Sequence, residues 1–292
     1  METLIQVIVS GLTLGAMYAV GTIGLSLVWA ALGMLNMAHG VLLAIGGYVS
    51  YTLATLWGLP PFLGLLASIV AGAIMGAALY YASVRRLNRH PAFEMNVIIA
   101  TFGLSVAGEN AILKIFGGYP YAQPFKAEGG FRLGGVHVPW HNLLIVGVAA
   151  VIMLVIAMVL SRTYTGRAIR ATAQDREAAR LMGVRVGAVF AQVLAIGGAL
   201  AGLSGVLLSS ITTLSPQVGF DPMLKAFIIC VIAGLGNVAG ALYMAFALGF
   251  FEAVIQFVIG VRFALPLMLL LVIVALIWRP YGVFGREDVS RL

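Results

Sequence analysis

Long apolar runs dominate this chain, and short polar or glycine-rich segments separate them. A helix needs about 20 mostly apolar residues to cross a hydrocarbon core of about 30 Å. The pattern therefore predicts an all-α polytopic membrane protein with about eight transmembrane helices, forming a single domain over residues 1–292. The expected spans are 4–27, 34–57, 61–82, 92–116, 139–161, 188–210, 238–258 and 263–279.

A shorter apolar piece, residues 224–236, lies between "SPQVGFDP" and "GLGNVAG". It is too short to cross a membrane in a straight helix, and glycine and proline flank it. Irregular backbone is tolerated at membrane depth where protein or a cavity covers it. We therefore expect a broken or half-spanning helix here.

The composition supports the membrane class. Hydrophobic residues make up 62% of the chain, charged residues only 9%, and the mean hydropathy is +1.06. A soluble domain carries roughly 25% charged residues, and a soluble chain this apolar would expose large apolar patches that promote aggregation. The first apolar run has no basic start and is too long for the core of a signal peptide, so we expect a retained span.

Most basic residues fall in three clusters beside apolar spans, and the formal net charge is +7. Such clusters indicate the cytoplasmic side of a membrane protein. A nucleic-acid site would need a basic face on a soluble module, and none is visible. The clusters are Arg85, Arg86 and Arg89; Arg162, Arg167, Arg170, Arg176, Arg180 and Arg185; and Arg279, Arg286 and Arg291.

All three clusters lie on the same side of the membrane if residues 224–236 and the glycine-rich segment after them reverse the direction of the chain, as a full transmembrane span does. The N-terminus is then outside and the C-terminus is cytoplasmic. Residues 117–138, 211–223 and 259–262 become the outside segments. The first of them is rich in Gly, Pro and aromatic residues, so we expect an ordered loop with little helix.

Residues 162–187 cannot lie across the membrane, because six arginines at about 2.5–3.5 kcal/mol each would cost roughly 15 kcal/mol or more. The alanines of this cytoplasmic segment predict a helix that Gly166 precedes and Gly183 ends. Ala171, Ala178, Leu181 and Met182 would form a small apolar stripe. Two interpretations remain: a solvated loop that carries positive charge, or a helix that docks on a soluble partner.

The segment Glu177-Ala178-Ala179-x-x-x-Gly183 resembles the coupling loop of ABC importer permeases, although the Leu-Pro that often follows is absent. Six further segments occur in a matching order: "SGLTLGAMYAV", "LGMLNMAHG", "ATFGLS", "SPQVGFDPMLKAF", "GLGNVAGA" and "RPYGVFGR". With "TGRAIRATAQD" they resemble the shorter permease of the branched-chain (hydrophobic) amino acid ABC importer family over nearly the whole chain.

The resemblance implies an ABC importer permease fold in a bacterial inner membrane. It implies three kinds of partner besides the lipid bilayer: a second similar permease subunit, two cytoplasmic ATPase subunits and a periplasmic solute-binding protein. ATP and Mg would bind the ATPases, and no cofactor would bind this chain. The substrate would be a branched-chain amino acid; urea, short amides and aromatic acids are alternatives, because Glu109 departs from the common Leu-Gln-Asn pattern.

The coupling function would rest on ten residues of the charged segment. These are Gly166, Arg167, Arg170, Ala171, Gln174, Asp175, Glu177, Ala178, Ala179 and Gly183. A partner surface could approach the alanines closely, while the arginines and acids pair across the contact.

Polar residues inside apolar spans are expensive and are candidates for the translocation path. The candidates are Asn36, His39, Gly40, Glu109, Asn110, Lys225, Gly234, Gly236, Asn237 and Glu252. Each also has a structural interpretation. Asn36 and His39 would stand at the cytoplasmic start of the second span, with Asn36 as a helix cap, and Lys225 would anchor near the outer face.

Glu109 would face the bundle interior, and Lys114 would extend to the membrane surface. Glu252 and Gln256 share a helix face and would form interhelical hydrogen bonds. The "GLGNVAG" glycines lack the dinucleotide-binding spacing and would form a backbone break.

The sequence does not indicate a disulfide, a metal site, a nucleotide site or a catalytic site. The single cysteine, Cys230, permits neither an internal disulfide nor a cysteine-based metal site, and the four histidines are scattered, so we expect no metal. The chain has no zinc-protease, serine-hydrolase or P-loop motif, so any ATP must bind another chain. A self-sufficient channel or secondary transporter stays an alternative; an intramembrane enzyme lacks a catalytic constellation.

Overall fold

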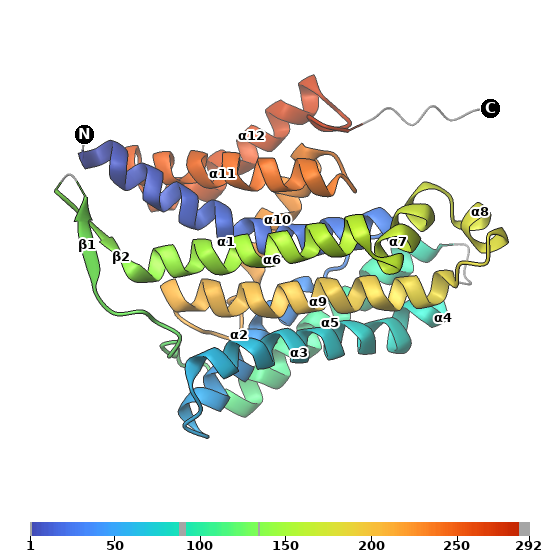
Figure 1. Ribbon diagram of the computed structural model, residues 1–292, viewed down its shortest axis with the longest axis horizontal. Coiled ribbons are helices and arrows are strands. Elements are labelled where there is room, and N and C mark those ends of the chain that lie inside the picture. Colours follow the sequence, from blue (N-terminus) through green and yellow to red (C-terminus); the bar gives the residue numbers. More distant parts are fainter. Residues whose placement is uncertain (1, 88–91, 134, 286–292) are drawn as a thin grey trace.

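The computed structural model describes residues 2–87, 92–133 and 135–285, and they form a long helical bundle (Figure 1). Its helices are α1 (Glu2–Leu32), α2 (His39–Thr55), α3 (Pro61–Leu79), α4 (Arg85–Leu87), α5 (Phe93–Phe116), α6 (Trp140–Arg162), α7 (Tyr164–Gln174), α8 (Arg176–Leu181), α9 (Val186–Ile211), α10 (Phe220–Ala233), α11 (Val238–Val258) and α12 (Ala264–Trp278). A π-helical turn, η1 (Tyr80–Val84), joins α3 to α4, and a 3-10 turn, η2 (Val261–Phe263), precedes α12.

The bundle has two distinct ends (Figure 1). The hairpin end carries the start of α1 and an antiparallel pair of strands, β1 (Gly130–Leu133) and β2 (Val136–Pro139). The opposite end, here called the coupling end, carries α4, α7 and α8. The described arginines of the first two clusters therefore gather at one end, as the charge pattern predicts; Arg89, Arg286 and Arg291 lie outside the described residues.

Seven helical segments of the described chain are long and apolar enough to cross a membrane. These segments are α1, α3 continued to Leu87, α5, α6, α9, α11 and η2–α12. These agree with seven of the expected spans. The remaining expected span, residues 34–57, is wrong as a continuous helix, because α2 has only 17 residues and begins at His39.

Two crossings are therefore broken near the middle of the bundle. The start of α2 lies beside Tyr18, the seventeenth of the 31 residues of α1, because His39, Tyr18 and Pro222 line one small space. Residues 33–38 return from the end of α1 to this level without forming a helix. The chain breaks there because Gly33 adopts a positive φ of 57° and Asn36 turns the backbone.

The second break precedes α10. Leu214 pairs with Tyr121 at the hairpin end, and Gly219 lies against Gly40 half-way down the bundle. From there α10 runs on to Gly236, which lies near Trp29 and Ala30. The segment 212–236 thus crosses the whole bundle, half as turns and half as helix. This confirms the expected half-spanning helix and the reversal of chain direction that the charge clusters require.

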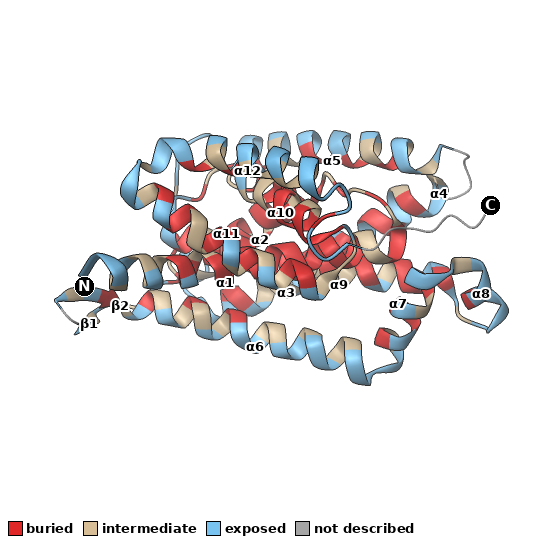
Figure 2. Ribbon diagram, turned by 90° about the horizontal axis from the view of Figure 1, so that it is seen from above, coloured by how far each residue is buried: buried red, intermediate tan, exposed pale blue. Residues whose placement is uncertain are grey.

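Glycines set the close packing of the central helices. Backbone meets backbone where Gly72 faces Gly198, where Gly46 faces Gly202 and where Gly249 faces Gly15. Helices in lipid gain little from hydrophobic burial against one another, so small residues that allow close van der Waals contact stabilise their packing. The buried residues accordingly concentrate in α1, α2, α9 and α10, while α5 and α6 lie at opposite edges (Figure 2).

The segment between α5 and α6 ties three elements together at the hairpin end. The Gln123 side-chain amide donates to the Gly47 carbonyl at 3.3 Å. The Ala127 amide donates to Nδ1 of His141 in α6 at 3.3 Å, and Nε2 of the same histidine lies 2.8 Å from the Ser210 hydroxyl of α9. The expected ordered loop with little helix is therefore confirmed, and it also contains the β1–β2 hairpin, in which Phe131 pairs with Val138.

Candidate functional site

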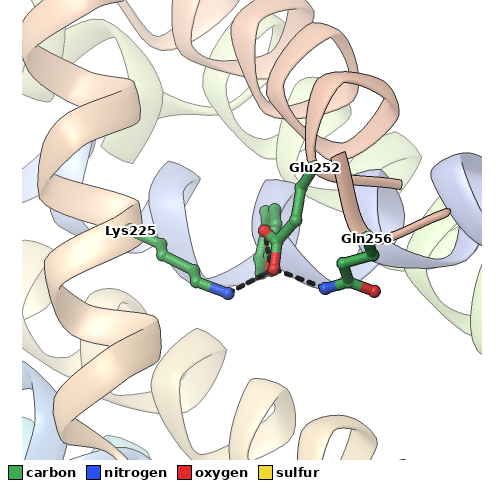
Figure 3. Close-up of polar contacts among 4 residues, drawn as sticks. Lys225, Glu252 and Gln256 are labelled. Carbon is green, nitrogen blue, oxygen red and sulfur yellow. Dashed lines mark hydrogen bonds and ion pairs between the residues drawn. The ribbon is translucent and has the colours of Figure 1, made fainter. Parts of the chain in front are cut away.

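A buried ion pair joins α10 to α11 inside the bundle. The Lys225 ammonium nitrogen lies 2.6 Å from Oε1 of Glu252, and the Glu252 side chain is only 2% exposed (Figure 3). The two helices approach α1 together, so the pair forms where three helices meet. The expectation that Lys225 anchors at the outer surface is wrong, since its ammonium group is bonded within the protein.

Two neutral side chains complete this polar cluster, here defined as Tyr18, Lys225, Glu252 and Gln256. The Tyr18 hydroxyl donates to Oε2 of Glu252 at 2.5 Å, and Lys225 donates to the same hydroxyl at 2.9 Å. Gln256 donates to Oε1 of Glu252 at 2.9 Å (Figure 3). A buried charge pair is tolerated only where further hydrogen bonds satisfy both ions, and these contacts supply them.

The candidates His39, Asn36 and Gly40 lie at the broken start of α2, half-way down the bundle. The Asn36 side-chain oxygen accepts a hydrogen bond from the Ala38 amide at 3.1 Å, so it supports the turn before the helix. The Met37 amide donates to the Thr101 hydroxyl of α5 at 3.1 Å. The predicted position at the cytoplasmic membrane surface is wrong, because the chain re-enters the bundle before α2 begins.

Several polar atoms beside this break have no hydrogen-bond partner among the described residues. They include Nε2 of His39 and the hydroxyl oxygens of Thr22 and Ser26, all fully buried. Tyr18, Thr22 and Ser26 stand four residues apart and so share one face of α1. His39 and Tyr18 line a small space of about 10 Å³ with Ser204 and Pro222. This level of the bundle is polar but closed.

Glu109 and Asn110 lie apart from this level, on the peripheral helix α5. Glu109 is half-buried, and among the described residues its carboxylate accepts one hydrogen bond, from Ser105 of the same helix, at 3.2 Å. Asn110 is exposed and donates to the Val106 carbonyl at 2.8 Å. The expectation that Glu109 faces the bundle interior is therefore not confirmed, because among the described residues its carboxylate has no hydrogen-bond partner on another helix.

The charged segment forms two helices instead of the single helix expected. Asp175 breaks it, with extended backbone between α7 and α8. The Asp175 carboxylate then accepts hydrogen bonds from the amides of Glu177 and Ala178, at 2.8 and 3.0 Å. This cap stabilises the first turn of α8. Gly166 lies inside the first turn of α7, and Gly183 follows α8 with a φ of 84°.

The two helices present different surfaces. Ile169 and Thr172 of α7 are buried against the bundle, and Ala171 is half-buried. Leu181 and Met182 at the tip are 88% and 85% exposed, and Ala178 beside them is exposed too. The exposed polar candidates of the segment are Arg167, Arg170, Gln174, Asp175 and Glu177, whereas Ala179 is buried. The expected stripe therefore divides, and three of its four members form an apolar tip.

A polar groove of about 420 Å³ separates this segment from the end of α1 and the turn before α11. Gln174 and Arg176 line one side, and Trp29 and Gly236 line the other. In that turn Asn237 caps α11 by accepting from the Gly240 amide at 2.8 Å, and it donates to the Phe284 carbonyl at 3.0 Å. The candidates Gly234, Gly236 and Asn237 thus lie at the coupling end, away from His39 and Lys225.

The family of the chain follows from a family model, described as the permease component of the branched-chain amino acid transport system, that matches residues 7–277. The chain belongs to this permease family. BraD of Pseudomonas aeruginosa, a high-affinity branched-chain amino acid transport permease, is 32% identical over 99% of this chain and 98% of its own. LivH of Escherichia coli, named likewise, is 30% identical over 99% and 97%.

The fold also has a solved counterpart. A chain of PsaBC from Streptococcus pneumoniae, solved in complex with a Fab, superposes with a TM-score of 0.50 at 15% identity. The match covers 94% of this permease and 91% of that chain. It shows that the two share a fold and, at this identity, carries no residue-level information.

Tyr18, Thr22 and Ser26 of this permease were not predicted as site residues, although their spacing on one helix face was a signal in the sequence. Lys225 and Glu252 were predicted separately and not as a pair, because they are 27 positions apart in the sequence. Among the described residues no group of three or more His, Cys, Asp or Glu side chains could hold a metal ion.

Proposed function

We propose that this permease forms half of a translocation path with a second permease subunit, and that α7 and α8 couple it to cytoplasmic ATPases. The observation that carries the proposal is the exposed apolar tip of Ala178, Leu181 and Met182 at the coupling end. Exposed apolar clusters rimmed by charge are typical of protein contacts. Arg180 and Glu177 supply such a rim.

The proposed orientation places the coupling end in the cytoplasm. Arg85, Arg86 and the arginines of 162–185 support it through the positive-inside rule. The N-terminus then faces outward, and the hairpin end offers its ordered loop to a periplasmic solute-binding protein. The C-terminus is cytoplasmic in this arrangement.

The groove beside α7 and α8 suggests how movement would reach the path. A shift of these helices would press on the end of α1 and on the turn Gly234–Asn237 across the groove. That turn ends α10, which carries Lys225 of the polar cluster. ATP-driven closure of the ATPases would thereby reach the broken helices in the middle of the bundle.

The proposed substrates are branched-chain amino acids, as the printed names of BraD and LivH support. ATP and Mg would bind the ATPase subunits, and this chain would supply neither nucleotide binding nor hydrolysis. Urea, short amides and aromatic acids are the competing substrates in the same assay.

The decisive experiment combines assembly and transport. We expect Ala178→Arg to abolish co-purification of the ATPases and ATP-driven leucine uptake in proteoliposomes. Ala122→Arg, an exposed alanine in the hairpin-end loop, is the matched control and should retain the ATPases. Unchanged assembly and uptake in Ala178→Arg would disprove the coupling function. Uptake by this chain alone, driven by an ion gradient, would instead indicate a secondary transporter.

A further inference from the structure

Two helix N-termini converge in the middle of this bundle. α2 begins at His39 and α10 begins at Phe220, and the two starts touch through Gly40 and Gly219. A side chain on Gly219 would overlap the Gly40 carbonyl, so only glycine permits this contact. The first amides of a helix lack intrahelical acceptors, and the helix dipole adds partial positive charge there. Here the His39 and Phe220 amides already donate to the Asn36 and Gln217 carbonyls, and Pro222 has no amide hydrogen. The amides left for an anionic group are those of Gly40, Val41 and Asp221.

A buried polar atom without a partner lies at the same place. His39 is 1% exposed, and its Nε2 atom has no hydrogen-bond partner among the described residues. The imidazole lines the small space with Tyr18, Ser204 and Pro222, the third residue of α10. Buried polar atoms are nearly always paired in native proteins, with protein, water or a ligand, so this atom is available to a bound group.

None of the charged side chains around this level lines the small space. The Lys225 ammonium group donates a hydrogen bond to the hydroxyl of Tyr18, which lines the space, and Glu252 balances the charge of Lys225. Asp221, in the first turn of α10, has an exposed side chain and does not line the space. Asp221 is nevertheless close enough to interact electrostatically with Tyr18, so an anion here would depend on the helix-start amides and His39 and not on an excess of positive side chains.

We propose that the junction of α2 and α10, with His39, binds the carboxylate group of the transported solute. The inference rests on the proposed transport function and extends it to the substrate class, namely solutes with a carboxylate and an apolar body. At about 10 Å³ the space holds no more than a water molecule, so the structure represents a closed state. Binding requires the two helix starts to separate.

Three probes test the ligand chemistry on the assembled transporter in nanodiscs without solute-binding protein. L-leucine carries both charged groups, 4-methylpentanoate lacks the amine, and 3-methylbutylamine lacks the carboxylate. We expect equilibrium dialysis to detect binding of the first two and not of the third. His39→Leu should weaken binding about tenfold or more, because a charge-assisted hydrogen bond is lost. His39→Gln, which keeps an N–H donor, should bind with intermediate affinity.

The controls separate this inference from the proposed function. His137→Leu, an exposed histidine of β2, should bind like the wild type. Thermal unfolding must show that the His39 variants are folded, and His39→Gln decides the matter if His39→Leu is not. Wild-type affinity in both variants, amine binding equal to carboxylate binding, or no binding at all would overturn the proposal. Carboxylate binding that depends on His39, without leucine import, would instead refute the proposed transport function alone.

A second observation, independent of the first, concerns α5. The least buried of the candidate spans are α5, α6 and α12. Of these, α6 and α12 are entirely apolar from 143 to 160 and from 264 to 278. α5 instead carries Glu109 and the exposed Asn110, the latter about 9 Å before the helix ends at Phe116. In a membrane span, such groups face protein or water, not lipid.

We infer that α5 packs against the second permease subunit, whose donors complete the hydrogen bonding of Glu109 and Asn110. Gly103, with open space beside it, and the exposed Ala107 permit close approach on the same flank. Ala107 also lines an apolar recess of about 390 Å³ between α2, α3 and α5, which a side chain of that subunit can fill.

Photo-crosslinking in native membranes tests this surface. A benzophenone amino acid in place of Asn110 should yield an adduct whose peptides belong to a second permease subunit or a second copy of this chain. The same group at Leu154 of α6 or Leu270 of α12, both exposed, should give no such adduct. A permease adduct from either control in place of Asn110, or none from Asn110, would overturn the inference.

Discussion

Lys225 and Glu252 form an ion pair of 2.6 Å that links the half-spanning helix α10 to α11. Tyr18 of α1 contacts both residues, so three helices share one charge-neutral cluster. Each ion depends on the other, because a lone buried charge is far less stable than a bonded pair.

Neutralising one partner of the ion pair should therefore destabilise the protein more than neutralising both. Lys225→Met or Glu252→Gln alone is expected to destabilise the protein by about 3–5 kcal/mol. The double variant should recover much of that loss, since no uncompensated charge remains. Unfolding of the purified variants in detergent measures the free energies. Equal losses in both single variants and the double variant would contradict the interpretation.

Close backbone packing predicts a strong effect of one methyl group at Gly205. A Cβ atom there would overlap the carbonyl oxygen of Leu43 in α2, so Gly205→Ala should cost about 1–3 kcal/mol or more. Gly147→Ala in α6 is the control, because nothing lies within 4 Å of its added Cβ. It should be neutral or stabilising, since alanine favours helix. The thermal midpoints of the two variants should therefore move apart.

The apolar tip predicts a loss of ATPase binding without loss of fold. Leu181→Glu combined with Met182→Glu should weaken ATPase association about tenfold or more, as expected when central apolar contacts are removed. Both side chains are exposed, so the thermal midpoint should stay near that of the wild type. Tyr119→Glu, 80% exposed near the hairpin end, should leave ATPase affinity unchanged. Wild-type affinity in the double variant would refute the tip as the contact.

The Asp175 cap predicts a local effect on α8. Asp175→Ala removes the acceptor for two amides and should cost about 0.5–2 kcal/mol, whereas Asp175→Asn retains a capping oxygen. Hydrogen exchange of residues 177–183 should accelerate in the alanine variant and stay nearly unchanged in the asparagine variant. Exchange in α9, which does not depend on this cap, is the internal reference.

The sequence determined the membrane class, most of the spans and the clustering of arginines at one end. These follow from local properties: span length follows from the apolar run, and the cost of burying arginine excludes 162–187 from the membrane. The half-spanning helix before Gly234 could also be predicted, because glycine and proline flank an apolar run that is too short to cross the membrane.

Only the tertiary structure decided where the breaks lie and what meets there. The run 34–57 is apolar enough for a span, but contact between Gly40 and Gly219 fixes the start of α2 in mid-bundle. The Lys225–Glu252 pair and the junction at His39 depend on helices distant in sequence. Hydropathy reports how a residue partitions into lipid and carries no information about which partner a buried charge will find.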